Sequence, residues 1–340
     1  MHLNLKRGNT VRKLVLFSAI LIAGVAITAR ADNENAGKSA YSFLKVGVSA
    51  RAQAMGGAMV ALADDEYSAF YNPAGLGRLV PITEVEDQYG DWHEVEGDID
   101  NFFAASYNNY VADIQSGYLT YIKRQGYSGM LGFAVDYFNY GSFDRTDANN
   151  AHLGTFTASD IAIGATYGQR ASKNLYWGLT AKFIYQKLED YSSDGAALDA
   201  GIIYILGDDR TSIGLSARNI GVQLKGLTEN HKDPLPTSVH AGVAHALQGL
   251  PVNFSGQVDY PFDYDISFKA GVEFTGIDPL FLRAGWDSSG KDYETGSSRD
   301  NLGGFSGGFG YAWKNYHFDY SYSSFADLGN SHRISISGGF

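Results

Sequence analysis

The sequence of 340 residues contains no cysteine, only 7 proline residues and few basic residues. The lack of cysteine excludes a disulfide framework and a metal site built from thiolates. Lysine and arginine number 26 against 37 aspartate and glutamate, which gives a formal net charge of −11. A nucleic-acid-binding protein presents a basic face, so this acidic balance argues against a nucleic acid partner. Much of the acid falls in expected loops and turns, where solvated carboxylates are ordinary.

Beyond residue 31 the chain also lacks an apolar run long enough for a transmembrane helix, which needs about 20 residues. The longest later run, 200–206, is interrupted by Gly201 and stops at Gly207. A membrane protein of this sequence would therefore have to be a closed β-barrel. Lipid tolerates only helices, or strands whose backbone groups are all paired.

The N-terminus is typical of a secretory signal peptide. Basic residues precede an apolar stretch, Leu14–Ile27, and Ala29 and Ala31 supply the small residues of a cleavage site. The alternative is an uncleaved membrane helix, which needs about 20 apolar residues, more than this stretch has. We predict that residues 1–31 are a signal peptide and that Asp32 begins the mature chain.

The mature chain is rich in aromatic residues and glycine, and its strands are expected to show alternating apolar and polar residues. The sequence has 23 Tyr, 20 Phe and 41 Gly, which suits a barrel wall with aromatic girdles. Apolar and polar residues alternate with a period of two, which places one set of side chains on each face of a strand. A soluble lipocalin-like barrel would need only about eight strands, whereas we count about fourteen, most of them near the roughly 9–11 residues of a tilted membrane strand. They are 102–107, 114–122, 130–140, 161–167, 175–187, 198–206, 213–219, 239–247, 252–260, 266–274, 280–286, 305–313, 316–322 and the C-terminal residues.

The last nine residues, 332–340, alternate and end on an aromatic residue. Such a terminal strand resembles the signal that outer-membrane barrels present to the barrel-assembly machinery, here with Ile334, Ile336 and Phe340. We therefore predict an all-β fold, a transmembrane antiparallel β-barrel of about fourteen strands formed by residues 102–340. It would lie in the bacterial outer membrane, in contact with outer-membrane lipid. Short turns are expected at 219–221 and 314–315, and longer loops at 144–157 and 288–301.

Residues 45–80 differ from all that follows, because small side chains dominate their first half. Such a segment can pack its backbone closely against other backbone. Residues 66–71 are expected to form a short helical turn, and Pro73 then biases the preceding residue away from the α region. Residues 32–44 are expected to be a flexible lead-in, and residues 81–101 an acidic connection to the barrel.

Seven short stretches of the mature chain carry a resemblance to a known family. They are SARAQAMGGA (49–58), ALADD (61–65), YNPAGL (71–76), YFNYG (137–141), GTFTASD (154–160), DPLP (233–236) and FADLGNSHRIS (325–335). Together they resemble the PorV/PorQ family, whose members are related to the FadL-type fatty-acid transporters. The resemblance spans essentially the whole mature chain, and the acidic stretch 87–101 departs from it.

The resemblance implies a fourteen-stranded, FadL-like barrel with an N-terminal hatch, residues 45–80, folded into its lumen. PorV-type members serve the type IX secretion system, which exports proteins carrying a C-terminal sorting domain, whereas FadL-type members pass hydrophobic solutes. We therefore expect a non-enzymatic accessory or shuttle component of type IX protein secretion. Its partners would be secretion-system components or cargo sorting domains. The alternative is a FadL-like passive channel for hydrophobic small molecules. No cofactor is expected.

The candidate hatch or gating residues lie in the N-terminal signature. The Asn72–Ala74 motif is the strongest candidate, either as a structural turn that seats the hatch or as a gating element. Residues 64–66 could bind calcium through carboxylate oxygens, but an acidic cap for the following helical turn is favoured. The gating candidates are Arg51, Gly56, Gly57, Asp64, Asp65, Asn72, Pro73, Ala74 and Gly75.

Two patterns raise the question of catalysis. Residues 304–308 fit G-x-S-x-G, but that motif needs a strand, a strained turn and a helix, and here the aromatic residues continue a period of two. His240, His245 and His317 lie on predicted strands, where lumenal hydrogen bonding is favoured over a catalytic Ser/His pair. The sequence therefore predicts neither an enzyme nor a metal site.

Overall fold

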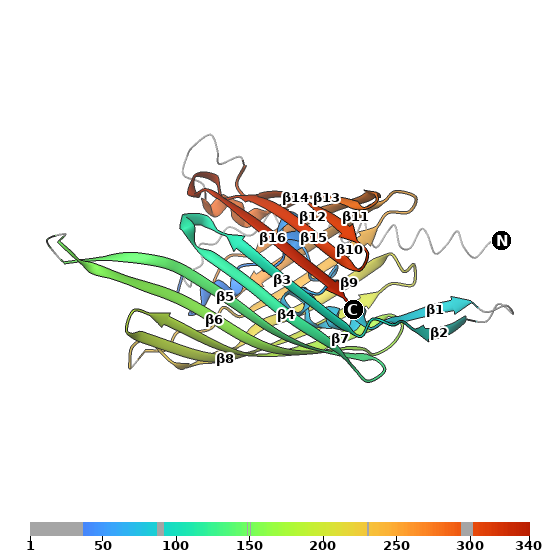
Figure 1. The fold of residues 1–340 in the computed structure, drawn as a ribbon, viewed down its shortest axis with the longest axis horizontal. Helices are drawn as coiled ribbons and strands as arrows, with labels where there is room; N and C mark the ends of the chain where they lie inside the picture. Colours follow the sequence, from blue (N-terminus) through green and yellow to red (C-terminus); the bar gives the residue numbers. More distant parts are fainter. Residues whose placement is uncertain (1–36, 87–91, 148, 150, 230, 294–301) are drawn as a thin grey trace.

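The computed structural model describes residues 37–86, 92–147, 149, 151–229, 231–293 and 302–340 (Figure 1). The predicted signal peptide, residues 1–31 with Ala29 and Ala31, lies outside these residues, as does the first part of the predicted lead-in. Within the described ranges, no helix is both long enough and apolar enough to cross a membrane.

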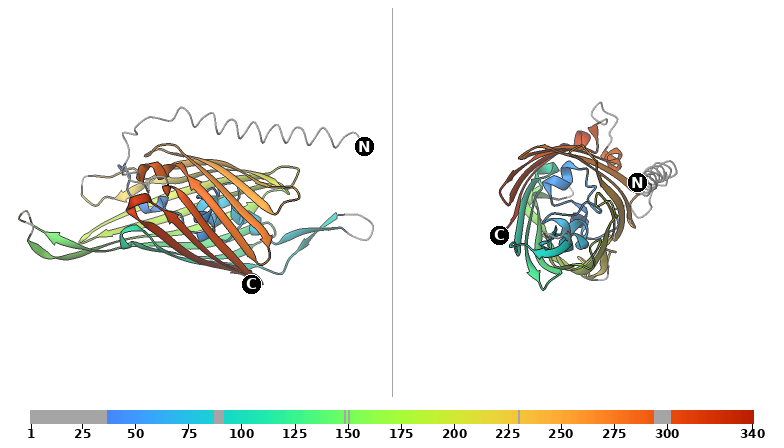
Figure 2. Two further views of the ribbon diagram at one scale, coloured as in Figure 1. Left: turned by 90° about the horizontal axis from the view of Figure 1, so that it is seen from above. Right: turned by 90° about the vertical axis from the view of Figure 1, so that its right-hand side faces the viewer.

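Fourteen antiparallel strands, β3 to β16, form one closed barrel (Figures 1 and 2). Each strand pairs with the next along the chain, and β16 pairs with β3 to close the wall. The predicted all-β barrel of about fourteen strands is confirmed. The barrel strands are β3 (Asn101–Asn109), β4 (Gln115–Gln125), β5 (Gly129–Thr146), β6 (His152–Arg170), β7 (Leu175–Leu188), β8 (Tyr191–Ile205), β9 (Thr211–Lys225), β10 (Ser238–Ala246), β11 (Val252–Pro261), β12 (Ser267–Ile277), β13 (Leu280–Asp287), β14 (Phe305–Trp313), β15 (Tyr316–Ser324) and β16 (Asn330–Gly339).

Side chains around the barrel wall alternate between two environments. On β7, Leu179 and Phe183 are exposed on the outside, whereas the intervening Thr180 is buried. β16 shows the same pattern, with Ile334 exposed and Arg333 buried. An apolar outer face suits the hydrocarbon interior of a bilayer, and the inward polar side chains then need hydrogen bonds or water.

Some strands run further than the period of two predicted. The pairing of β5 and β6 runs into the expected loop at 144–157, with register shifts, as far as Thr146 opposite His152. This hairpin projects beyond the rest of the wall (Figure 1). Most residues of its projecting part are exposed on both faces, so the sequence there has no reason to alternate. The predicted loop is therefore mostly strand.

The turn predicted at 219–221 is also wrong, because β9 continues through it. Arg218 and Asn219 together lie opposite Asp199 at a β-bulge in the pairing with β8. Asn219 has a φ of 56°, and its N–H donates to Asp199 Oδ1 at 2.7 Å. A bulge bends a strand without ending it, although Asn followed closely by Gly is a turn signal in the sequence.

The barrel has a short-turn end and a long-loop end. Connections such as 278–279 and 314–315 lie at the short-turn end, as does Phe340, whose N–H donates to Asn101 O at 2.8 Å. A hairpin precedes β3 and projects from this end (Figure 1). The connection 226–237 lies at the long-loop end with the described part of the predicted loop 288–301. The hairpin strands are β1 (Ile82–Glu86) and β2 (Trp92–Glu96). The described 3-10 helices of the long-loop end are η3 (Val111–Asp113), η4 (Ser288–Tyr293) and η6 (Ala326–Leu328).

Residues 40–80, called the lumenal segment below, run inside the barrel (Figure 2). Tyr41, Phe43 and Leu44 are already almost fully buried, and the rings of Phe43 and Phe138 of β5 lie 5.5 Å apart. The packed chain thus starts within the range predicted as a flexible lead-in. The segment contains η1 (Ser42–Lys45), α2 (Ala50–Ala54), α3 (Ser68–Tyr71) and η2 (Pro73–Leu79). α2 packs against β14 and β15, and η2 packs against β6 and β7.

Candidate functional site in the barrel lumen

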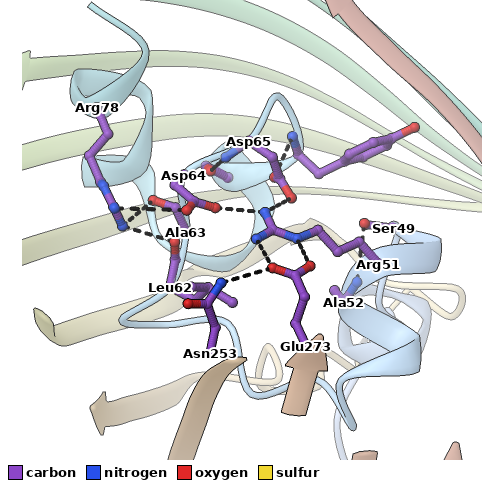
Figure 3. A network of polar contacts seen from close by, with 12 residues as sticks. Ser49, Arg51, Ala52, Leu62, Ala63, Asp64, Asp65, Arg78, Asn253 and Glu273 are labelled. Atoms are coloured by element: carbon purple, nitrogen blue, oxygen red, sulfur yellow. Dashed lines mark hydrogen bonds and ion pairs between the residues drawn. The ribbon is translucent and has the colours of Figure 1, made fainter. Parts of the chain in front are cut away.

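A polar network joins the lumenal segment to the barrel wall through Arg51 (Figure 3). Arg51 donates from Nε and Nη2 to the two carboxylate oxygens of Glu273 on β12, at 2.9 and 3.0 Å. Its Nη1 donates to Asp64 at 2.6 Å and to Asp65 at 3.1 Å. The planar guanidinium matches a carboxylate with two parallel hydrogen bonds. Arg51 therefore ties α2, a later part of the same segment and a barrel strand together.

Glu273 is shared with the barrel wall. Arg283 on β13 donates from Nε to Glu273 at 2.7 Å and from Nη1 to Asp319 on β15 at 2.5 Å. The side chains of Glu273 and Arg283 are 4% and 3% exposed. Removing one partner of such a buried pair leaves an uncompensated charge, at a cost of about 3–5 kcal/mol. The complete network therefore holds the segment in one position.

Asp64 and Asp65 contact groups of the protein itself. Arg78 of η2 lies 3.8 Å from Asp64. Asp65 Oδ1 accepts from the Tyr67 N–H at 3.0 Å, just before α3. In the described part of the chain, no group of three or more His, Asp and Glu side chains is arranged to hold a metal ion. Ion pairing and turn capping account for the contacts of both carboxylates.

Asn72 is buried and hydrogen-bonded on both sides of its amide. Its Nδ2 donates to Val60 O at 2.7 Å and to Ile202 O of β8 at 3.3 Å. Its Oδ1 accepts from the Ala74 N–H at 3.1 Å and so caps η2, which begins at Pro73. Proline suits the first position of a helix, where its missing N–H costs no hydrogen bond. The motif thus ties two parts of the segment to a barrel strand, while its role in gating stays a prediction.

The three candidate glycines of the segment are held in different ways. Gly56 has a φ of 66°, and a Cβ there would lie 2.6 Å from the backbone N and O of Trp286 on β13. Gly57 has a φ of 80°, and its Cβ would lie 3.3 Å from the end of the Lys269 side chain. A Cβ at Gly75 would lie 2.5 Å from a side-chain atom of α3. The left-handed backbone at Gly56 and Gly57 favours glycine, and close packing adds to this at Gly56 and Gly75.

Glycines of the barrel wall form a second set of close contacts with the segment, which the sequence reasoning missed. A Cβ at Gly201 would overlap Asn72 Oδ1, and one at Gly214 would overlap Val60 O. Glycine inside a strand often marks such a close approach of another backbone, so a signal was present in the sequence. Other wall glycines at which a Cβ would lie less than 3.0 Å from an atom of the segment are Gly168, Gly178, Gly195, Gly242, Gly271, Gly285 and Gly308.

A cavity of about 390 Å³ lies between the lumenal segment and the long-loop end. Phe70 and Tyr71 line the cavity on the side of the lumenal segment. At its mouth the ring of Phe325 lies 5.2 Å from Tyr110 and 5.0 Å from Tyr293. Small-molecule sites usually measure roughly 300–1,000 Å³, so the cavity is large enough for a small ligand. Charged or titratable wall residues also reach it: Arg218, His240, Asp259, Lys269, Asp287 and Arg333.

Ser238, His240 and Asp259 form a hydrogen-bonded chain on the cavity wall. Ser238 Oγ and His240 Nε2 are 2.9 Å apart, and His240 Nδ1 and Asp259 Oδ1 are 2.6 Å apart. A hydrolase triad has this order, but it also needs preorganised donors for an oxyanion. The backbone of β10 is engaged in ladders with β9 and β11, and Asp259 also pairs with Lys269 at 2.8 Å. These contacts fit the lumenal hydrogen bonding favoured for His240.

Two of the three residues predicted to signal barrel assembly are well exposed on the outer face. Ile334 is 56% exposed and Phe340 is 58% exposed, and Ile336 shares their side of the strand. The Phe340 ring lies 6.4 Å from that of Phe103 on β3. Their role as an assembly signal stays a prediction.

A closed fourteen-strand barrel with an apolar outer face has the architecture of an outer-membrane protein, and its fold is FadL-like. Similar solved structures include the Pseudomonas putida toluene transporter TodX, with a TM-score of 0.54 and 13% identity over 86% of this chain and 98% of that chain. The CymD monoaromatic hydrocarbon channel has a TM-score of 0.54 and 12% identity over 87% of this chain and 98% of that chain. A TodX mutant gives a TM-score of 0.57 and 13% identity over 86% and 99% of the two chains.

No protein-family model and no curated protein matches the sequence. At identities of 12–13% the structural likeness shows the fold alone. These neighbours are described as channels or transporters, and the expectation of a non-enzyme stays a prediction for this chain. The narrower PorV/PorQ assignment and the role in type IX secretion stay predictions from the sequence.

Proposed function

We propose that the protein is a passive outer-membrane channel for small hydrophobic molecules, with the lumenal segment as its gate. The observation that carries the proposal is the cavity, which has the size of a small-molecule site and an aromatic mouth, inside a closed barrel. The monoaromatic hydrocarbon channels of similar fold support the same function.

The route of a solute follows from the positions of the aromatic rings and the segment. A molecule entering from the long-loop end meets Tyr110, Tyr293 and Phe325, where apolar surface leaves water. The segment lies inside the barrel (Figure 2) and packs closely against the wall, so we expect passage to require the segment to shift. Its contacts with the wall are side-chain bonds and close packing, which can break while the ladder between the strands stays intact.

The test is uptake of the hydrophobic fluorescent probe N-phenyl-1-naphthylamine by cells with matched barrel levels. We expect faster uptake with the protein than without it, and faster still with Gly57→Leu, because the added side chain meets Lys269 and displaces the segment. Gly249→Leu is the matched control, since Gly249 has a φ of 78° but nothing within 4 Å of its Cβ position. Uptake equal to that of barrel-free cells in all strains contradicts the channel.

A second candidate function is the accessory or shuttle role in type IX secretion. The projecting β5–β6 hairpin favours it, because Leu153 is 60% exposed and the rings of Phe143 and Phe156 stack at 5.4 Å. Such apolar groups beyond the wall suit a protein partner. A pull-down with a C-terminal sorting domain, on the full barrel and on one carrying Phe143→Ser, Leu153→Ser and Phe156→Ser, tests this role. Capture by the full barrel alone supports it, and capture by neither contradicts it.

A further inference from the structure

Two arginines that line the cavity have no carboxylate partner among the described residues. Arg218 on β9 and Arg333 on β16 are 7% and 2% exposed. Among the residues that the structure describes, neither guanidinium lies within ion-pair distance of a carboxylate, and the Nε of each is buried without a hydrogen-bond partner. Asp136 attracts Arg333 electrostatically, but from beyond that distance. A buried charge without a close counter-charge is costly.

The other contacts of the two guanidinium groups are to neutral groups. Arg218 Nη2 donates to Leu44 O at 3.4 Å, and its guanidinium lies over the Phe70 ring, 4.6 Å from the ring centre. Arg333 Nη2 lies 3.0 Å from the side-chain oxygen of Asn108 in the amide orientation that satisfies the neighbours of Asn108. Neutral partners orient an arginine without cancelling its charge.

Two wall carboxylates that line the cavity, Asp259 and Asp287, are held by other groups. Asp259 pairs with Lys269 at 2.8 Å and lies 2.6 Å from His240. Asp287 lies 3.5 Å from the same lysine. Lys269 in turn repels Arg218. Neither of these wall carboxylates therefore cancels the charge of Arg218, which can attract an anion inside the cavity, while Asp265 and Asp292 line the cavity from the long-loop end.

Tyr71 supplies a further donor beside Arg333. Its Oη accepts from the N–H groups of residues 48 and 49 at 2.9 and 3.1 Å, so within the described structure its own proton is left for an acceptor. The space above Gly47 adjoins both groups, because a Cβ there would lie 3.0 Å from Tyr71 Oη and 3.7 Å from Arg333 Nη1. Phe70, under Arg218, and Tyr71 have ring centres 5.1 Å apart, so the two arginines flank one aromatic pair.

We propose that Arg218, Arg333 and Tyr71 bind the head of a small organic anion, a carboxylate or sulfonate with an aromatic or other apolar body. Arginine matches the oxygens of such a head with parallel hydrogen bonds, and the rings of Tyr293 and Phe325 at the mouth suit the body. This inference rests on the proposed channel function and makes amphiphilic anions the solutes that the cavity binds most tightly, while neutral hydrophobic molecules still pass. An inorganic anion has the charged group but no apolar part to contact the aromatic rings, so we expect it to bind more weakly.

Calorimetric titration of the purified full-length barrel in detergent tests the site with benzoate, with neutral benzamide and with inorganic phosphate. We expect benzoate to bind at least tenfold more tightly than either of the others. Arg218→Gln and Arg333→Gln should each weaken benzoate binding by about tenfold or more, as the loss of a charged hydrogen bond implies. The Lys variants at both positions should retain part of the affinity. Arg210→Gln, at an exposed position of the β8–β9 connection, is the matched control.

Equal affinities for benzoate and benzamide overturn the anion site, as do wild-type affinities in both Gln variants. If phosphate binds as tightly as benzoate, the proposal that the ligand needs an apolar body is wrong. These results do not contradict the channel function, because that function is tested separately by uptake of a neutral probe. The loss of that uptake with benzoate binding intact instead overturns the channel. Folding is checked by heat-modifiable migration on gels. The comparison of benzoate with benzamide on the wild-type barrel decides the matter even where a variant does not fold.

Discussion

At the level of single residues, the charges around Arg51 set how firmly the lumenal segment is held. Arg51 uses both edges of its guanidinium, one toward Glu273 of the wall and one toward Asp64 and Asp65 of its own segment. A lysine at this position would place a point charge where the planar fork now makes parallel bonds. The segment and the wall are thus coupled through one carboxylate, Glu273.

We predict that Glu273→Gln loosens the segment without opening the wall. The change leaves Arg51 and Arg283 without their shared counter-charge, at a cost of about 3 kcal/mol. Hydrogen exchange of residues 45–80 and probe uptake should both rise. Asp64→Asn is the control, because the Asp64 side chain is 31% exposed and such a pair contributes about 1 kcal/mol or less. Equal exchange in the two variants would contradict this role for Glu273.

The wall glycines give a second prediction at this scale. Gly214→Ala puts a Cβ into Val60 O, whereas Gly256→Ala on β11 meets nothing within 4 Å. We expect Gly214→Ala to displace the segment and raise probe uptake, since overpacking costs about 1–3 kcal/mol. Gly256→Ala should behave as the wild type in cells with the same barrel level. An equal response of the two variants would show that the close contact at Gly214 does not hold the segment.

At the level of the elements, the period of two predicted every barrel strand, because lipid on one side and a polar lumen on the other force alternation. It failed where that cause is missing. The projecting part of β5 and β6 is exposed on both faces, and the bulge at Asn219 places a turn-like residue inside a strand. Strand existence was therefore readable from the sequence, but strand ends were not.

The bulge allows a prediction for β9. Asn219 is 1% exposed, its Oδ1 accepts from Lys182 Nζ at 2.8 Å, and its φ is 56°. Asn219→Ala loses the acceptor and strains the backbone, so we expect a loss of about 2 kcal/mol or more. Asn219→Gly loses the same acceptor without the strain and should cost less. The temperature at which heat-modifiable migration changes ranks the variants. Equal temperatures would show that the left-handed backbone costs nothing.

Only part of the candidate site could be predicted from the sequence, because a local pattern marks the residues of the segment but not their partners on the wall. Arg51, Asp64 and Asp65 lie in one short stretch, so they could be singled out together. Their wall partner Glu273 lies on a strand far along the chain, and no local pattern marks it. Arg218 is on the lumenal side of β9, which the period of two implies, but its lack of a counter-charge follows only from the three-dimensional structure.

At the level of the whole molecule, the wall and the lumenal segment are held by different forces. The wall is a continuous ladder of backbone hydrogen bonds that closes between β16 and β3. In the described residues the segment adds no strand to that ladder and contacts it through side chains, caps and close backbone approaches. Motion of the segment therefore leaves the barrel closed to lipid, as a gated channel requires.

A reversible crosslink makes that separation testable. The chain has no cysteine, so a pair introduced by Ala61→Cys and Ser212→Cys carries its only thiols. These positions adjoin, because Ser212 Oγ donates to Ala61 O at 2.7 Å. We expect a short, cleavable bifunctional thiol reagent to fix the segment on β9 and to lower probe uptake to the level of barrel-free cells.

Cleavage of the reagent should restore uptake, and each single-cysteine variant should take up the probe at its untreated rate throughout. The ladder of the wall is unaffected by the bridge, so heat-modifiable migration should not change. If the bridged barrel passes the probe as fast as the unbridged one, solutes do not need the segment to move. The lumenal segment would then be a fixed filling of the barrel, and the solute path would have to lie elsewhere in the structure.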